Sequence, residues 1–174
     1  MHLDTTVTSS KIAVPIIDMS TGYIAHGKTF IRSDRVTIAS NGVARLLGRL
    51  GDRDLHLLRW SFSGSRSGLI AEFYENPEVI SNGSLRIPVN RNRIHPEFIP
   101  TIQTYVNPVI GNEGLLLYQT GFPGSGSGAS SNVVLISRDP YGWLLNRDNI
   151  YMWKLSNTSN QNMEVYVEID WAEL

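Results

Sequence analysis

The sequence contains no cysteine among its 174 residues, which excludes disulfide bonds, thiolate metal ligands and thiol nucleophiles. It also lacks any apolar run of the roughly 20 residues that a membrane-spanning helix needs. The first ten residues show neither the basic stretch nor the apolar stretch of a secretory signal. We therefore expect a soluble product made in a cytoplasm, with no membrane partner.

Neither sign of charge dominates the chain. Fifteen basic residues oppose sixteen acidic ones, which gives a formal net charge of -1. Nothing in this balance draws the whole chain to a phosphate backbone, so we expect no nucleic-acid partner. Hydrophobic residues make up 41% of the sequence, and this share is sufficient for the core of one domain of this length.

Catalytic motifs are scarce as well. The four histidines, His2, His26, His56 and His95, include no closely spaced pair of the kind that binds metal. No G-x-S-x-G nucleophile elbow is present. We therefore predict that the protein is not an enzyme and has no catalytic residues, no metal site and no cofactor.

One formal motif match concerns nucleotide binding. Gly22 to Thr29 satisfies the phosphate-loop pattern G-x-x-x-x-G-K-[ST]. Such a loop works when it joins a buried strand to the N-terminus of a helix. Here Pro15 interrupts the preceding apolar run, and the following Phe30 to Ala39 favours a strand and ends at Asn41-Gly42. We interpret the match as accidental.

Alternation of apolar and polar residues predicts strands. The clearest case is the run Met163, Val165, Val167, Ile169 and Trp171, whose side chains we expect to face the core. Leu58 to Phe62 and Leu69 to Tyr74 flank the turn Gly64 to Gly68 and predict a hairpin. Further strands are expected at 101–106, 115–120, 133–137 and 150–155. Short strands at this spacing are typical of a sandwich or barrel.

Little of the sequence favours a helix. Val43 to Leu58 has some helical character, but Gly48 and Gly51 interrupt it, and it is equally compatible with a loop followed by a strand. We predict an extended N-terminal arm at residues 1–20 and one domain at 21–174. The Gly/Ser-rich stretch 121–131 is interpreted as a surface loop.

Two groups of residues have binding chemistry and also an ordinary structural interpretation. Asn90-Arg91-Asn92-Arg93 could grip a carboxylate or phosphate, or could serve structural hydrogen bonding in a solvated loop. Tyr118, Tyr141 and Trp143 could form a sugar-stacking platform, although sandwich cores also use aromatic residues at strand ends.

Several short strings in one order carry a resemblance that covers the last two thirds of the chain. They are His26 to Phe30, Glu72-Phe73-Tyr74-Glu75-Asn76-Pro77, Asn82-Gly83, Asn90 to Arg93, Gly111 to Leu117, Trp143-Leu144-Leu145, Tyr151 to Asn157 and Ile169-Asp170-Trp171. In this order the chain resembles jelly-roll virion proteins of tailed bacteriophages, the capsid decoration or cement proteins. It departs from them at Trp171-Ala172-Glu173-Leu174, where relatives tend to end in Trp-Tyr-Glu, and in the stretch Arg45 to Leu58, which has no counterpart and could serve this protein's own partner.

The resemblance implies an all-β, antiparallel jelly-roll-type β-sandwich with little or no helix. It also implies a structural role on the capsid surface of a virion, with the major capsid protein as partner and a homotrimer as the assembled form. As candidate capsid or subunit contacts we name Asp4, Thr5, Thr6 and Val7 in the arm, together with Asn90, Arg91, Asn92 and Arg93.

Two alternatives remain open at this point. One is a virion or tail-associated adhesin that binds host carbohydrate, because jelly rolls host both roles. The other is a jelly-roll enzyme of the cupin or sugar-isomerase kind, for which the sequence shows neither the ligands nor the acid–base residues.

Overall fold

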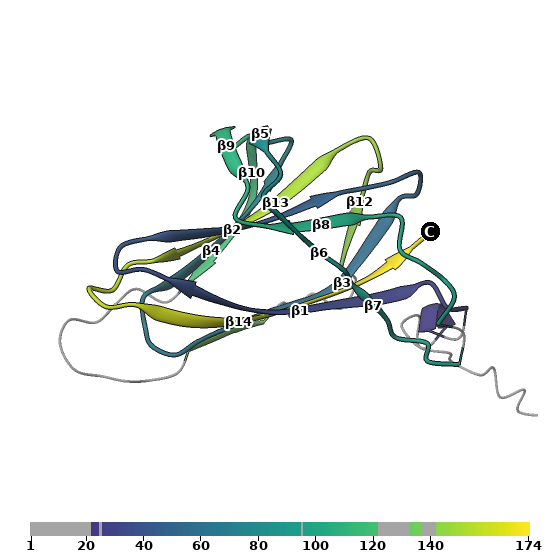
Figure 1. Ribbon diagram of the computed structural model, residues 1–174, viewed down its shortest axis with the longest axis horizontal. Helices are drawn as coiled ribbons and strands as arrows, with labels where there is room; N and C mark the ends of the chain where they lie inside the picture. Colours follow the sequence, from purple (N-terminus) through teal and green to yellow (C-terminus); the bar gives the residue numbers. More distant parts are fainter. Residues whose placement is uncertain (1–21, 25, 95, 122–132, 137–141) are drawn as a thin grey trace, which may run out of the picture.

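The computed structural model describes residues 22–24, 26–94, 96–121, 133–136 and 142–174 (Figure 1). Within them, Gly22–Ile24 form one helical turn. The strands are β1 (Thr29–Ile38), β2 (Val43–Arg49), β3 (Leu55–Gly64), β4 (Leu69–Glu75), β5 (Glu78–Ser81), β6 (Ser84–Arg86), β7 (Val89–Asn90), β8 (Gln103–Val106), β9 (Val109–Asn112), β10 (Leu115–Gly121), β11 (Val133–Ile136), β12 (Trp143–Leu145), β13 (Ile150–Asn157) and β14 (Met163–Glu173). The arm at residues 1–20 and the Gly/Ser stretch 122–131 lie outside the described residues.

The strands form two antiparallel sheets that face each other. The first sheet has the order β11-β3-β14-β1-β7, with β12 also paired to β3, and the second has the order β10-β4-β13-β2-β8-β6. The chain passes from one sheet to the other between β1 and β2, between β2 and β3, and again between β3 and β4. After β10 it returns to the first sheet at β11, crosses to the second sheet at β13 and ends in the first sheet at β14. This strand order is that of a jelly roll, and the predicted fold class with almost no helix is confirmed.

Aromatic side chains fill the space between the sheets. The ring of Trp153 on β13 lies 4.5 Å from that of Phe73 and 4.8 Å from that of Trp60, measured between centroids. Phe62 completes the group at 5.0 Å from Trp153. These residues come from both sheets, because alternate positions of each strand point inward. The centre of the sandwich is therefore an aromatic cluster that joins the two layers.

The last strand, β14, lies in the middle of the first sheet, between β1 and β3. Met163, Val165 and Val167 are buried as the alternation predicts, and Tyr166 is exposed on the opposite face. The register shifts at a bulge between Asp170 and Trp171. From Asp170 to Glu173 the alternation no longer holds, because four consecutive residues are buried.

The pairing of two chain segments differs from what the sequence predicts. Leu58 to Phe62 and Leu69 to Tyr74 do not form a hairpin, because β3 belongs to the first sheet and β4 to the second. The turn 65–68 instead carries the chain across the sandwich, so that Phe62 and Phe73 approach Trp153 from different sheets. The stretch Val43 to Leu58, which the sequence leaves open between a helix and a loop followed by a strand, contains β2 and the start of β3.

Residues 76–114 form an insertion between β4 and β10. Its strands β5 and β9 pair with each other and lie beside the second sheet (Figure 1). Val79 and Ile110 from this pair pack against a small apolar cluster on that sheet, formed by Leu47, Tyr74 and Met152. The rest of the insertion, β6 to β8, extends the two sheets at one edge of the sandwich.

Candidate functional site

A short segment of the insertion, residues 84–90, runs from one sheet to the other at this edge. Its first part, β6, is the outermost strand of the second sheet, where it pairs with β8. Its last part, β7, is the outermost strand of the first sheet, where it pairs with β1. Only Ile87 and Pro88 lie between them, so the segment closes this side of the sandwich (Figure 1). We call residues 84–90 the crossing strand.

Arg86, Pro88 and Asn90 of the crossing strand contact the rest of the domain. The guanidinium Nε of Arg86 lies 3.3 Å from the Asp34 carboxylate, and Pro88 is buried. The buried Asn90 amide donates hydrogen bonds to the carbonyl oxygens of Gly27 (3.0 Å) and Phe98 (3.1 Å). These contacts fix which face of the strand points outward.

The alternate residues Leu85, Ile87 and Val89 point away from the core, with 54%, 82% and 51% of their surface exposed. We call these three residues the crossing-strand surface. Burying them under a partner would contribute roughly 3–6 kcal/mol before the cost of association is subtracted. Adjacent apolar residues on an outermost strand are a recognised signature of an interaction site.

The segment that follows the crossing strand contains the cluster predicted as an interface. Asn90 and Asn92 are buried, and the Asn92 amide donates to the carbonyl oxygen of Ile24 (3.0 Å). Both side-chain amides therefore serve structural hydrogen bonding, which is one of the two roles that the sequence left open for this cluster. Arg91 and Arg93 are exposed, and their place in an interface stays a prediction. Asp4, Thr5, Thr6 and Val7 lie outside the described residues.

Arg91 reaches the bulge of β14. Its guanidinium lies 3.2 Å from the buried carboxylate of Asp170, which also lies 3.3 Å from the guanidinium of Arg59. Burial raises the pKa of Asp170, while the two arginines oppose this rise. The insertion is thus joined to the centre of the first sheet by an ion pair between the exposed Arg91 and the buried Asp170.

The segment that matches the phosphate-loop pattern has a different structure from such a loop. Gly27 has φ of 71°, and a Cβ placed there would lie 2.6 Å from the ring of Phe98, so this glycine serves a tight turn. Lys28 is followed directly by β1, in which Thr29 is fully buried and pairs with Ala172. A strand, and not a helix N-terminus, therefore follows the motif.

Four arginines, three in the stretch Arg45 to Leu58 and one directly after it, make contacts inside the chain. Their partners are Glu113 for Arg45 (3.1 Å), Asn82 for Arg49 (2.8 Å), Glu173 for Arg53 (3.5 Å) and Asp170 for Arg59 (3.3 Å). These contacts give the stretch a structural role in joining the insertion and β14 to β2 and β3.

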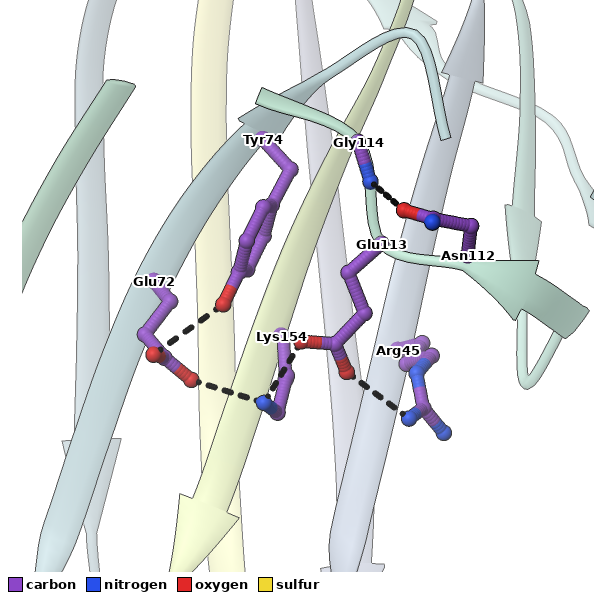
Figure 2. A network of polar contacts seen from close by, with 7 residues as sticks. All are labelled: Arg45, Glu72, Tyr74, Asn112, Glu113, Gly114 and Lys154. Atoms are coloured by element: carbon purple, nitrogen blue, oxygen red, sulfur yellow. Dashed lines mark hydrogen bonds and ion pairs between the residues drawn. The ribbon is translucent and has the colours of Figure 1, made fainter. Parts of the chain in front are cut away.

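A polar network attaches the turn between β9 and β10 to the second sheet (Figure 2). Glu113 in this turn accepts hydrogen bonds from Arg45 (3.1 Å) and Lys154 (2.9 Å). Lys154 also lies 3.1 Å from Glu72, whose carboxylate accepts a hydrogen bond from the Tyr74 hydroxyl (3.1 Å). Desolvation, together with the Glu72 hydrogen bond, raises the pKa of Tyr74 to about 12, so this hydroxyl keeps its proton at neutral pH. The paired charges of this network therefore hold the turn between β9 and β10 against the second sheet.

Comparisons with known proteins identify no family for the chain. No family model and no curated protein sequence matches it. Among solved structures, VP1 of trichodysplasia spinulosa-associated polyomavirus is 8% identical, with 82% of this chain and 77% of that chain covered and a TM-score of 0.17. VP1 of Merkel cell polyomavirus, in complex with 3'-sialyllactosamine, is also 8% identical, over 83% and 77%, with a TM-score of 0.14. The T=1 particles derived from infectious bursal virus give 11% identity over 83% and 40%, with a TM-score of 0.14.

TM-scores of this size carry no argument about fold or function. The jelly-roll assignment therefore rests on the strand order and pairing of this chain itself.

Two hollows are relevant to small-molecule binding. An apolar cavity of about 60 Å³ lies between the sheets beside Trp153 and Trp171, and its volume is well below the 300–1,000 Å³ typical of ligand sites. A shallow hollow of about 390 Å³ lies on the outer face of the first sheet, lined by Ser61, Ser63 and the exposed Tyr166 among others. The described residues contain no group of three His, Asp or Glu side chains that could hold a metal ion. No helix in the described part of the chain is long and apolar enough to cross a membrane.

Two of the aromatic residues considered as a sugar platform are in contact, because the rings of Tyr118 and Trp143 lie edge to face with 6.4 Å between their centroids. Trp143 is half-buried and packs edge-on against Phe73 at 6.0 Å, in agreement with its interpretation as a core residue. Tyr118 is partly exposed and contacts Trp60 at 5.7 Å. Tyr141 lies outside the described residues.

The crossing-strand surface is not predicted by the sequence. Its signal is the alternation of Leu85, Ile87 and Val89 with Arg86, Pro88 and Asn90. By itself that pattern predicts a strand with its aliphatic face toward the core, and only the structure shows the aliphatic face outside.

Proposed function

We propose that the chain is a structural protein of a virus particle and acts as a capsid decoration protein of a tailed bacteriophage, in a binding role without catalysis. The observation that carries this proposal is the crossing-strand surface, three exposed aliphatic residues on the edge of a jelly-roll sandwich. Jelly rolls are a common architecture of capsid proteins. The ordered strings that resemble phage decoration proteins support the same function.

The proposed partner is the major capsid protein, and the proposed assembled form is a homotrimer on the outer surface of the head. A trimer suits the places where three capsid units meet, because each subunit then repeats one modest contact. Repeated weak contacts add through effective concentration, so the assembled lattice binds more tightly than a single capsid subunit. Such binding would stabilise the head against the pressure of its genome.

Two groups of residues are proposed for the capsid contact. Asp4 to Val7 belong to an arm with little to bury when it is free, which is typical of segments that order on a partner. Arg91 and Arg93 are exposed beside the crossing strand and can donate to carboxylates.

Cryo-electron microscopy of virions that carry the protein tests its location. We expect density for a jelly-roll trimer on the outer head surface at threefold or quasi-threefold positions. Density on the tail would contradict the proposal, and so would absence of the protein from purified particles.

Removal of residues 2–10 tests the arm. We expect the truncated protein to occupy assembled capsids less fully than the full chain at equal concentration, measured by co-sedimentation, while its oligomeric state stays the same. Unchanged occupancy would show that the arm makes no contribution to capsid binding.

The adhesin function remains the second candidate, and the hollow on the outer face of the first sheet favours it. Tyr166 is 54% exposed there, beside the hydroxyl groups of Ser61 and Ser63, an arrangement that can stack on and hydrogen-bond to a sugar. A glycan array tests this function: binding that Tyr166→Ala abolishes, together with density on the tail, would favour the adhesin over the decoration protein.

A further inference from the structure

The segment between β7 and β8 exposes three large apolar side chains within six residues. Ile94 is 84% exposed, Phe98 is 47% exposed and Ile99 is 78% exposed. We call these three residues the apolar loop. Large apolar side chains that gather in an exposed part of a chain are typical of a contact site.

The chain enters the domain beside the apolar loop. Gly22 is the first described residue, and its carbonyl oxygen accepts a hydrogen bond from the backbone N–H of His26 (3.2 Å), so it lies next to the turn at Gly27. The ring of Phe98 covers this turn, since a Cβ placed on Gly27 would lie 2.6 Å from it. The Asn90 amide also donates to the carbonyl oxygens of both Gly27 and Phe98. Figure 1 shows the helical turn that begins at Gly22 beside the segment between β7 and β8.

The sequence before this entry point contains a short apolar run. Residues 12–17 read Ile-Ala-Val-Pro-Ile-Ile, so five of the six are aliphatic. Only four residues separate this run from Gly22. Because an extended chain spans at most about 3.6 Å per residue, Ile17 lies within about 18 Å of Gly22. The tether therefore keeps the apolar run close to the apolar loop.

We propose that residues 12–17 pack against the apolar loop of the same chain. The contact removes apolar side chains of both segments from water, which is the dominant favourable contribution to such packing. Pro15 suits an extended segment, because it has no N–H to donate and its φ is fixed. A segment from another molecule would have to compete with one whose short tether gives it a millimolar effective concentration. The tether thus favours the chain's own segment as the occupant.

This packing has a consequence for the first eleven residues. It fixes the point from which they extend, close to the apolar loop, which directly follows Arg91 and Arg93. Asp4 to Val7 and the two exposed arginines then lie on one side of the domain, and together they can form one capsid contact. This consequence rests on the proposed function, whereas the packing itself does not.

A nearby leucine provides a matched control. Leu144 on β12 is 74% exposed, which is close to the exposure of Ile99. It lies opposite His56 in the strand register, and the ring of His56 contacts that of Tyr23 at 5.7 Å. Leu144 is therefore also near the point where the chain enters the domain. An isolated exposed leucine is ordinary on a protein surface, so we expect it to attract residues 12–17 less than the apolar loop does.

Pairs of introduced cysteines test the contact in the isolated full-length protein. The chain has no cysteine of its own, so a disulfide can form only between the introduced residues. We expect the variant Ile16→Cys/Ile99→Cys to form an intramolecular disulfide roughly tenfold faster than Ile16→Cys/Leu144→Cys, because packing raises the effective concentration of one pair above that of the other. Mass spectrometry of oxidised samples measures both rates.

Hydrogen exchange tests the same contact without a cross-link. In the full-length chain Ile16→Asp should speed exchange of the peptide that contains the apolar loop by roughly tenfold, because a charged side chain weakens the apolar packing. Thr8→Asp, in the same arm but outside the apolar run, should leave this exchange unchanged. Unchanged exchange in β13 and β14 verifies that both variants are folded.

Three results would overturn the proposal. Equal rates for the two cysteine pairs would show that residues 12–17 have no preference for the apolar loop. A disulfide that joins two molecules would assign the loop to another copy's segment. Unchanged exchange of the loop in Ile16→Asp would leave it to a different partner. All of these measurements use the isolated protein, so their failure is distinct from absence of the protein on the head of a virion.

Discussion

The side chain of Asn157 joins two loops at one end of the sandwich by hydrogen bonds. Its replacement by alanine measures what these hydrogen bonds contribute to the free energy of unfolding. The side chain is 2% exposed. Its amide nitrogen donates hydrogen bonds to the carbonyl oxygens of Ile38 (3.3 Å), Ala39 (2.9 Å) and Gln161 (2.7 Å). Its carbonyl oxygen accepts from the backbone N–H (3.0 Å) and the hydroxyl (2.7 Å) of Ser159.

The magnitude follows from the number of groups left without a partner. A buried polar group that loses its hydrogen bond costs about 1–3 kcal/mol. Ala39 and Gln161 are exposed residues, so water can replace the amide at their carbonyl oxygens, whereas Ile38 is buried. We expect Asn157→Ala to lower the free energy of unfolding by about 2–4 kcal/mol, which corresponds to a fall in Tm of about 5–15 °C for a domain of this size.

Urea unfolding followed by tryptophan fluorescence measures this loss, since Trp60 and Trp153 lie in the core. Asn160→Ala is the matched control, because Asn160 is exposed in the same loop and should change the free energy of unfolding by less than about 0.5 kcal/mol. Equal stability of the two variants would refute the role assigned to the Asn157 amide.

Asn157→Asp sharpens the test through its pH dependence. The new carboxylate would face carbonyl oxygens in place of the donating amide, so its pKa in the folded state should be raised above the ordinary value near ~3.9. A raised folded-state pKa means that stability is present at acid pH and is lost as the pH rises through that pKa. We expect this variant to be less stable than Asn157→Ala at pH 7, and the difference to shrink toward pH 4. A difference independent of pH would contradict the assignment of the amide as donor.

Two further predictions concern the first sheet and the phosphate-loop pattern. Val167→Asp should abolish soluble folding because it buries an unpaired charge, whereas Glu168→Lys on the other face of β14 should be tolerated; equal soluble yields would refute the register. The segment Gly22 to Thr29 should bind no nucleotide, because a strand follows it, and micromolar ATP binding in calorimetry that Lys28→Ala abolishes would overturn this expectation.

The sequence predicts most strands of the sandwich because burial on one face imposes a period of two. Met163, Val165 and Val167 are buried as this period requires, and the strand runs expected at 115–120 and 150–155 correspond to β10 and β13. The pairing of strands is harder to predict. The turn 64–68 has the composition of a hairpin turn, but the same composition serves a connection across a sandwich, and only long-range contacts distinguish the two.

Asp170 shows a second limit of local patterns. The alternation places it on the outer face, and a bulge together with two arginines from distant parts of the chain makes it buried. Arg91 comes from the insertion, 79 residues earlier. No local pattern contains this information, because it depends on which segment folds over the strand.

The crossing strand shows the same limit for a candidate site. Leu85, Ile87 and Val89 have the alternation of a half-buried strand, yet the half that a core would bury is exposed. Periodicity identifies an aliphatic face and does not specify what covers it. A site made of such a face is visible only when the strand has been placed at an edge.

The central place of β14 has a consequence for the order of events during synthesis. β1 and β3 both pair with β14 in the first sheet, but the ribosome produces β14 well after them. A nascent chain that ends before Met163 therefore holds two strands whose shared partner does not yet exist, with Phe30 and Trp60 unable to reach their final packing. Closure of the sheet must wait until β14 has emerged, and pairing over such distances in sequence is slow, on the order of milliseconds to seconds. During that interval the incomplete chain is open to wrong pairing with other strands, which makes the speed of translation through the last quarter of the chain a determinant of yield.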